Sequence, residues 1–405
     1  MNPIVSHRRP QIRPFAGVMG VYDSQLTDPT LTGTGGVPSV GAYGVAGEAG
    51  LIGYKAYKHG TVGVNYRGDY RNYVNGKFYN GTDQFIALDW RHALTKHVTV
   101  NLQESAGSYA RAFSGPGIGG FLDPSLVHNP ATDIFDARTH YTSTSGDLLY
   151  SSSPRLSFGF GGRGFMVRRK SVSLVGLDGY DAHGDAVYRL TRRATGGVYY
   201  RFTHYEYTRA FGAADMHTLG VQYALKLSRS WEFSAQVGAS RVELQSTKEV
   251  TIDPVIAAIT GQYSGSVATH KMNYVPDFNG RLTHGFSSGN VVFNYSRRVN
   301  PGNGVYLTSQ YETGGMAISY VGLHHWNFGF DGGYDRYSSL TETIGPFHGY
   351  RGGLGLTRDL GRNFYATLRG DYRHYDIHYD FFRRDQIRAT LGVTWSPGEL
   401  PLALW

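Results

Sequence analysis

The sequence predicts a closed antiparallel transmembrane β-barrel of about 18 strands. Three observations support this fold class. Segments of about ten residues alternate apolar and polar side chains along nearly the whole chain, a period of two that is typical of β-strands. Aromatic residues recur at the ends of these segments. Long connections follow the odd-numbered segments and short ones follow the even-numbered segments, which is the asymmetry of transmembrane barrels.

The stretch Gln386–Trp395 shows the alternation most clearly. Ile387, Leu391 and Trp395 lie on its apolar face, and Arg388, its only charged residue, lies on the polar face. A half-buried strand of a soluble sheet alternates in the same way, so it is the repetition along the chain that favours a barrel. Because an open sheet edge is not tolerated within a membrane, this last strand is expected to pair with the first.

Composition agrees with one β domain. The 405 residues include 55 glycines and 31 tyrosines, which suit turns, close strand contacts and half-wet pleated surfaces. The absence of cysteine excludes disulfides and thiolate metal sites. The longest apolar run, Val255–Ile259, is far shorter than the roughly 18 residues of a spanning helix. We expect one domain over 1–405, with a periplasmic tail (1–12), the barrel (13–395) and a C-terminal tail (396–405).

The first residues, Met1–Pro10, include basic side chains but no apolar core after them. We therefore expect no signal peptide in this sequence. On the barrel interpretation, the sequence would be that of a mature form or a truncated one.

The alternation places nine strands in the first half of the chain. In the third, Val62 and Tyr66 share one face and Arg67 and Asp69 share the other. A long irregular connection, Arg111–Phe135, follows the fifth strand. The expected strands are Arg13–Asp23, Tyr43–Ala56, Thr61–Arg71, Asp83–His92, one beginning at Val98, Arg138–Tyr150, one around Phe158–Met166, Tyr180–Leu190 and Val198–Tyr207.

Nine more strands follow in the second half. A second long loop is expected over Gln245–Met272, and a shorter one over Asn300–Gly304. Tight turns such as Ser287–Gly289 join the even strands to the odd ones. The expected strands are His217–Leu227, Trp231–Val242, Asn273–His284, Asn290–Arg298, one ending near Gly322, Asn327–Arg336, Gly349–Thr357, Phe364–Arg373 and Gln386–Trp395.

Over its whole length the chain resembles the porin-like outer-membrane β-barrels of Gram-negative bacteria. The resemblance rests on the strand pattern and on Gly392–Trp395, which is similar to the aromatic-ending assembly signal of such barrels. One departure is that Ser396–Trp405 follow this signal, so that Leu402–Trp405 is the alternative terminal element. The resemblance implies an outer-membrane location, contact with lipid and lipopolysaccharide, and recognition of Gly392–Trp395 by the barrel-assembly machinery.

The polar strand faces carry many charges, which would be very costly against lipid. We therefore expect them to line a water-filled lumen. Their signs are nearly balanced, which predicts cross-strand ion pairs on the wall of a polar channel. The candidate lumen residues are Arg67, Asp69, Asp89, Arg91, Arg163, Asp181, Asp185, Arg189, Arg201, Arg281, Arg298, Asp331, Asp335, Arg369, Asp371, Arg373 and Arg388.

No catalytic, cofactor or metal site is expected, and the chain is not expected to be an enzyme. The Gly115–Gly120 run lacks the Lys-Ser/Thr of a phosphate-binding loop and is better explained as a flexible loop. Asp181, His183 and Asp185 share one strand face at metal-ligand spacing, but a hydrated lumen wall is the better interpretation. His324–His325 is best explained as a solvated turn. Nucleic-acid binding is not expected, because the basic residues do not cluster on one element.

The function that follows is a passive channel for small hydrophilic solutes. Basic loops would add a mild preference for anions. Two alternatives remain open: a pore for export or uptake of an anionic polysaccharide, and an adhesion or structural barrel that acts through its two long loops. The residues expected in basic loops and ends are Arg8, Arg9, Arg168, Arg169, Lys170, Arg192, Arg193, Arg383 and Arg384.

Overall fold

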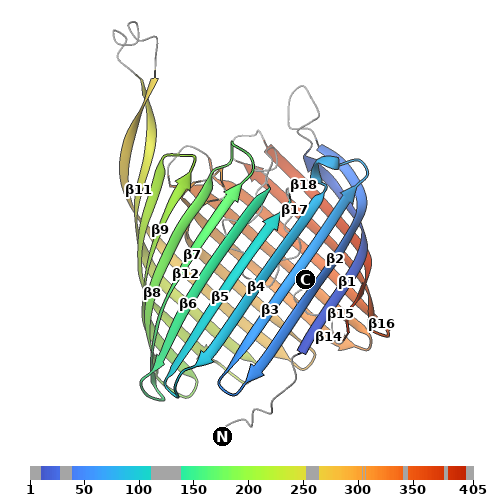
Figure 1. The fold of residues 1–405 in the computed structure, drawn as a ribbon, viewed down its shortest axis with the longest axis horizontal. Coiled ribbons are helices and arrows are strands. Elements are labelled where there is room, and N and C mark those ends of the chain that lie inside the picture. Colours follow the sequence, from blue (N-terminus) through green and yellow to red (C-terminus); the bar gives the residue numbers. More distant parts are fainter. Residues whose placement is uncertain are drawn as a thin grey trace.

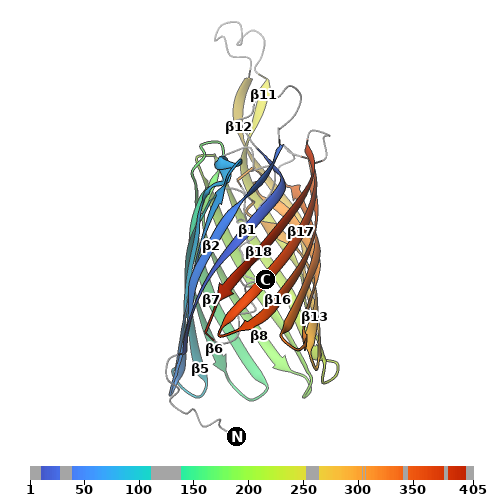
Figure 2. The same cartoon turned by 90° about the vertical axis from the view of Figure 1, so that its right-hand side faces the viewer.

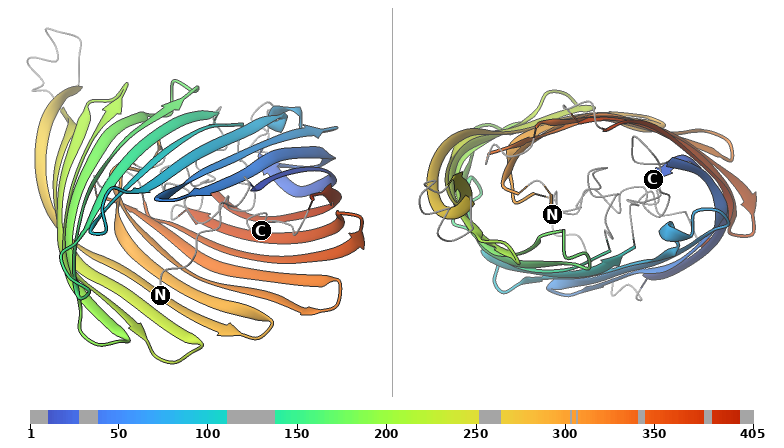
Figure 3. Two further views of the ribbon diagram at one scale, coloured as in Figure 1. Left: turned by 60° about the horizontal axis from the view of Figure 1, so that its bottom comes forward. Right: turned by 90° about the horizontal axis from the view of Figure 1, so that it is seen from above.

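The chain forms one closed antiparallel sheet of 18 strands, as the sequence predicts. Figure 1 shows the strands tilted around a common axis, and Figure 3 shows from above that they form a single oval ring. No helix among the described residues is long and apolar enough to cross a membrane. The structure is a computed structural model, and it describes residues 11–27, 39–110, 138–251, 264–302, 304–305, 307–340, 345–377 and 382–397.

The strands follow one another around the ring, each paired with its neighbours in the sequence. One helical turn, η1 (Lys77–Tyr79), lies between the third and fourth strands. The first nine strands are β1 (Gln11–Thr27), β2 (Ser39–Tyr57), β3 (Gly60–Tyr73), β4 (Gly81–Ala93), β5 (Val98–Tyr109), β6 (Thr139–Ser151), β7 (Leu156–Arg169), β8 (Gly176–Arg189) and β9 (Ala194–Thr208). The other nine are β10 (Gly212–Lys226), β11 (Trp231–Thr251), β12 (Ser264–Phe286), β13 (Gly289–Asn300), β14 (Ser309–Leu323), β15 (Trp326–Ser339), β16 (Phe347–Gly361), β17 (Phe364–Ile377) and β18 (Phe382–Trp395).

The ring closes where β18 meets β1. The two strands pair without a break from Ala16↔Trp395 to Asp23↔Arg388, while β18 also pairs with β17. Leu391 is 64% exposed on the outer face, whereas Arg388 is 7% exposed on the inner face. The predicted pairing of the last strand with the first is therefore confirmed, and with it the absence of an open edge.

The outer face is apolar although it is exposed. Val18, Leu219 and Leu354 each expose more than half of their side-chain surface on this face. Aromatic residues such as Trp90 and Tyr150 lie on the outer face within a few residues of the short turns. Exposed apolar side chains in a continuous band, bordered by aromatic rings, are what a lipid-facing wall requires.

The connections differ at the two ends of the barrel. Each even strand from β2 to β16 is followed by a turn of two or four residues, and these turns lie at the bottom of Figure 1. We call this the short-turn end and the opposite rim the long-loop end. Connections after odd strands are longer, with two exceptions: only residues 209–211 separate β9 from β10, and only residues 378–381 separate β17 from β18. The predicted asymmetry is thus confirmed with two exceptions.

The four-residue turns share a side-chain hydrogen bond that fixes their shape. In the turn after β4, the Thr95 hydroxyl oxygen accepts hydrogen bonds from the backbone N–H groups of His97 and Val98 at 3.1 and 3.0 Å. Hydroxyl side chains commonly hold turns in this way. Equivalent pairs of bonds are accepted by Ser153, Thr191 and Ser228.

The predicted loop over Gln245–Met272 is largely wrong. β11 continues to Thr251 and β12 begins at Ser264, and the two strands pair without a register shift. Figures 1 and 2 show this ribbon rising above the other strands at the long-loop end. Alternation is lost there because neither face of the ribbon meets lipid, so the sequence pattern could not reveal these residues as strand. The predicted loop over Arg111–Phe135, with Gly115–Gly120, lies outside the described residues.

The assignment of basic residues to loops also needs correction. The structure places Arg168 and Arg169 in β7 and Arg383 and Arg384 in β18, while Arg192 and Arg193 lie in a short turn. Arg168 faces outward and pairs with Asp178 on β8. These strands extend past the lipid-facing band, where charged residues are tolerated on both faces. Basic loops therefore do not support a preference for anions. Lys170 follows β7, and Arg8 and Arg9 lie outside the described residues.

Replacing Thr191 with Val should destabilise the barrel, because two backbone N–H groups at the β8–β9 turn lose their acceptor. We expect a loss of about 1 kcal/mol in the free energy of unfolding, measured by urea titration of protein inserted into lipid vesicles. Thr195→Val in β9 is the matched control, since the Thr195 hydroxyl has no hydrogen bond with the described residues. Equal losses in the two variants would contradict this role of the turn hydroxyl.

Candidate functional site

The inner wall of the barrel is the candidate functional surface. The strand register places every predicted lumen residue on the inner face, opposite the exposed apolar set. They fall on two arcs of the ring. The first arc, β15–β18 and β1–β4, carries Arg67, Asp69, Asp89, Arg91, Asp331, Asp335, Arg369, Asp371, Arg373 and Arg388. The second arc, β7–β13, carries Arg163, Asp181, Asp185, Arg189, Arg201, Arg281 and Arg298.

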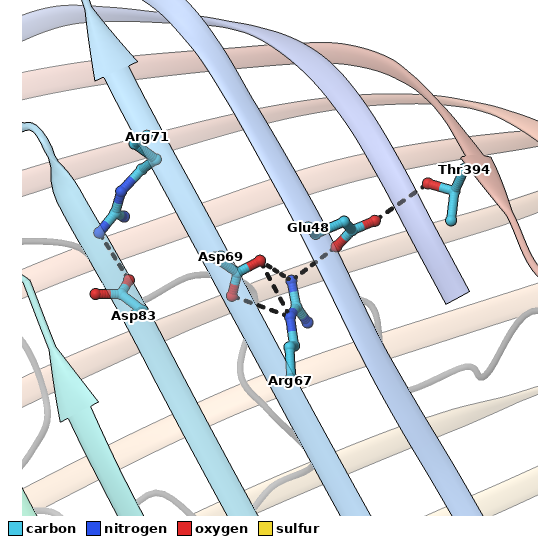
Figure 4. Close-up of polar contacts among 6 residues, drawn as sticks. All are labelled: Glu48, Arg67, Asp69, Arg71, Asp83 and Thr394. Carbon is cyan, nitrogen blue, oxygen red and sulfur yellow. Dashed lines mark hydrogen bonds and ion pairs between the residues drawn. The ribbon is translucent and has the colours of Figure 1, made fainter. Parts of the chain in front are cut away.

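A buried ionic cluster lies beside the closing pair of strands (Figure 4). The Arg67 guanidinium contacts Glu48 through Nη2 at 3.2 Å and Asp69 through Nε at 3.1 Å. The second Glu48 oxygen accepts a hydrogen bond from the Thr394 hydroxyl at 3.1 Å. The Arg67 and Glu48 side chains are 8% and 6% exposed, so these contacts are little screened by water. Together they join β18, β2 and β3.

Glu48 can reach Thr394 only because glycine occupies the strand between them. The register aligns Glu48 on β2 with Gly17 on β1, and Gly17 with Thr394 on β18. A Cβ atom at Gly17 would lie 2.7 Å from the Thr394 hydroxyl oxygen and 2.9 Å from Oε1 of Glu48. Any side chain at this position would displace the hydrogen bond.

The same arrangement recurs on β16. Asp331 on β15 aligns with Gly353, which aligns with Asp371 on β17. Arg369 reaches across this glycine to Asp331, with 2.9 Å between its Nη2 and Oδ1 of the carboxylate, and also contacts Asp371 at 2.6 Å. A Cβ atom at Gly353 would lie 2.7 Å from both Arg369 Nη2 and Asp331 Oδ1.

A third inward glycine, Gly161, lies beside His183, one of the three candidate metal ligands. Gly161 on β7 lies between Asp147 on β6 and His183 on β8, and His183 Nε2 is 3.2 Å from Asp147 Oδ1. Asp181 is instead paired with Arg163 at 2.8 Å. Across the described residues, no group of three or more His, Asp or Glu side chains is placed to hold a metal ion. His183 also approaches Asp181, with 3.7 Å between its Nδ1 and Oδ1 of the carboxylate.

A second buried layer lies closer to the long-loop end. Arg71 Nη2 contacts Asp83 at 2.7 Å, and Asp83 also accepts a hydrogen bond from the backbone N–H of Ala110 where β5 ends. On β1, Asp23 accepts a hydrogen bond from the Tyr73 hydroxyl at 2.5 Å. Asp23 was not apparent from the sequence, because the first strand is mainly apolar or small on both faces.

Strands β16–β18 carry a basic stripe on the inner face. It consists of Arg351, Arg369, Arg373, Arg384 and Arg388, against two inward carboxylates on the same three strands, Asp371 and, near the short-turn end, Asp359. Arg351 is 46% exposed, whereas Arg369 is 13% exposed. Three further carboxylates flank the stripe: Asp331 and Asp335 on β15, and Asp23 on β1. Sequence reasoning missed Arg351, which sits in a glycine-rich strand, and Arg384, which was expected in a loop.

Several inward charges remain accessible to water. The side chains of Asp147 and Asp331 are 43% and 41% exposed, and Arg163 is 39% exposed. Arg163 and Asp331 belong to ion pairs, Asp147 contacts His183, and all three face the inside of the ring. Solvent therefore reaches the inner wall on both arcs.

One part of the inner wall is apolar, which the sequence did not predict. Phe165, Leu177 and Val242 point inward near the long-loop end and are buried. The β13–β14 connection covers this region: the Tyr207 hydroxyl donates a hydrogen bond to the Pro301 carbonyl at 3.1 Å, and Tyr205 contacts the Thr308 hydroxyl at 3.2 Å. Gly302 and Gly304 adopt φ values of 90° and 98°, which let this connection turn inward. Pro301 and Thr308 therefore lie against the inner wall at that end.

Comparison with known proteins gives structural likenesses only. No protein-family model matches this chain, and no curated protein matches it in sequence. Among solved structures, OccAB3 from Acinetobacter baumannii is 12% identical over 95% of this chain and 99% of that chain, with a TM-score of 0.44. OccK2 (OpdF) from Pseudomonas aeruginosa, solved with glucuronate, is 12% identical over 96% of each chain, with a TM-score of 0.45. OpdK from the same organism, solved with vanillate, is 11% identical over 95% of this chain and 98% of that chain, with a TM-score of 0.44.

Replacing Gly17 or Gly353 with Ala should destabilise the barrel, because the new methyl group displaces a charged hydrogen bond on the inner wall. We expect each variant to lose about 1 to 3 kcal/mol in the free energy of unfolding from lipid vesicles. Gly370→Ala is the matched control: this glycine faces outward on β17, and an added Cβ atom would meet nothing within 4 Å. If all three variants lose the same stability, the glycines do not serve the ion pairs.

Proposed function

We propose that this protein is an outer-membrane channel for the passive diffusion of small hydrophilic solutes, with a preference for anions. The observation that carries this proposal is the set of water-accessible ion pairs on the inner wall. Charged side chains such as Asp147 and Arg351 face the inside of the ring and keep more than two fifths of their surface exposed. A lumen filled by packed apolar side chains could not accommodate them.

The size of the barrel supports the same function. Barrels of 16–18 strands leave an aqueous lumen rather than a packed core. Here the inner charges are largely paired, so they form a rigid hydrated wall. Such a wall suits solutes that carry their own hydration and do not need a tight binding site.

The preference for anions rests on the basic stripe of β16–β18. Its five arginines outnumber the two inward carboxylates on the same strands, and from this we infer a positive potential along β16–β18. Guanidinium groups bind carboxylate and phosphate groups in a two-pronged geometry. Small carboxylates and phosphates are therefore the solutes that this wall favours.

An outer-membrane location is supported by the exposed apolar outer face with its aromatic borders. We infer that lipid and lipopolysaccharide contact this face. We further infer that the barrel-assembly machinery recognises Gly392–Trp395, which forms the end of β18 at the short-turn end.

In planar bilayers with a salt gradient, the protein should show stable conductance. The sign of its reversal potential should indicate that anions pass more readily than cations. Arg351→Gln should shift the reversal potential toward zero, because it removes the most exposed cation of the stripe. Arg358→Gln is the matched control, since Arg358 lies on the same strand but faces outward against Trp326. An absence of conductance would contradict the channel, and a preference for cations would contradict the role of the stripe.

A further inference from the structure

One carboxylate lies on the lipid-facing side of the barrel. Glu104 on β5 aligns with Leu88 on β4 and Thr144 on β6, and all three point outward and are exposed. The Glu104 carboxylate accepts a hydrogen bond from the Thr144 hydroxyl at 2.5 Å. It has no ion pair with any described residue. An acidic side chain in this position is unusual, because the other outward charges lie near the ends of the strands or, like Arg241 and Glu243 on β11, pair with each other.

Glu104 lies near the middle of the apolar band. It is six residues from Val98, where β5 leaves the short turn. With a rise of about 3.4 Å per residue and a strand tilt of about 40°, this places it about 15 Å above the turn, within a band about 25 Å tall. An ionisable group at that depth, without an ion pair among the described residues, indicates a surface that a protein partner covers.

A complementary donor lies at the same height two strands away. Tyr66 on β3 also points outward, is 38% exposed, and has no hydrogen-bond partner for its hydroxyl among the described residues. It is six residues from Gly60, where β3 leaves its own short turn, just as Glu104 is six residues from Val98. Equal distances from turns at the same rim place Tyr66 and Glu104 level with each other, with β4 between them.

This arrangement fits a second copy of the same chain. A two-fold axis along the membrane normal, passing in front of β4, brings Glu104 of one subunit against Tyr66 of the partner subunit, and the reverse. Leu88, 47% exposed on β4, then lies next to the axis. A partner with a different sequence would not need two complementary groups at equal height on either side of one strand.

The flanks of this face allow close approach. On β2, Gly47 and Ala49 point outward, and on β6 Gly146 does so. The two-fold axis places β2 of one subunit opposite β6 of the other. Small residues at such contacts let two membrane-embedded surfaces approach closely, and interior polar groups then hydrogen-bond across the interface. We propose that this protein forms a two-fold dimer through the outer face of β2–β6, held by reciprocal Glu104–Tyr66 hydrogen bonds.

Cysteine cross-linking of the full-length protein in lipid vesicles tests the proposal, because the chain has no cysteine of its own. Leu88→Cys should give a disulfide-linked dimer under mild oxidation. Leu368→Cys on β17 is the matched control: it is also 47% exposed on the outer face, but lies away from the proposed interface. Cross-linking of the Leu88 variant no faster than that of the Leu368 variant would overturn the proposal.

A second comparison tests the contact itself. Adding Glu104→Leu to the Leu88→Cys variant should slow dimer cross-linking at least tenfold, since the hydrogen bonds to the partner subunit are lost. Leucine suits a lipid-facing position, so the variant barrel should still fold and insert. Its resistance to unfolding in detergent at room temperature would verify that the barrel has folded. Unchanged cross-linking in an inserted Glu104→Leu variant would show that Glu104 does not hold the dimer.

Discussion

The closing pair of strands is the constraint on which the rest of this structure depends. Within a membrane, every backbone N–H and C=O group must find a partner inside the chain, so a sheet that spans it cannot keep an edge. Here β1 and β18 remove the edge, and side chains reinforce the junction where Glu48 meets Thr394 across Gly17. Once the ring is closed, successive side chains of each strand point alternately to lipid and to the interior. Charged side chains therefore lie mainly on the inner face.

Inward glycines leave space for charged side chains to reach one another across a strand of the inner wall. A guanidinium or carboxylate that reaches across one strand finds a partner two strands away, and the intervening glycine leaves the space. Gly17, Gly161 and Gly353 do this at three separate places on the ring. The paired charges give the wall rigidity without removing it from water. The basic stripe of β16–β18 then leaves an uneven field, which is the physical origin of the selectivity that we propose.

Much of this fold could be predicted from the sequence, because lipid enforces a period of two wherever a strand crosses the membrane. The strand number, the closure and the inward position of residues such as Arg67 and Asp331 follow from that period. What lies beyond the lipid could not be predicted: the tops of β11 and β12, and Arg384 on β18, have no alternation to reveal them. The role of Gly17 was also hidden, since it depends on side chains from two other strands. The apolar inner patch around Tyr205 depends on a connection folding inward, which no local pattern encodes.

The closure can be tested directly with a pair of cysteines across the seam. Val18 and Val393 are aligned on the outer face of β1 and β18, at a spacing that suits a disulfide. The Val18→Cys, Val393→Cys variant should form an intramolecular disulfide in lipid vesicles as readily as the Ala366→Cys, Val393→Cys pair across β17 and β18. Cross-linking of the β17–β18 pair without that of the β1–β18 pair would show an open sheet and contradict the barrel.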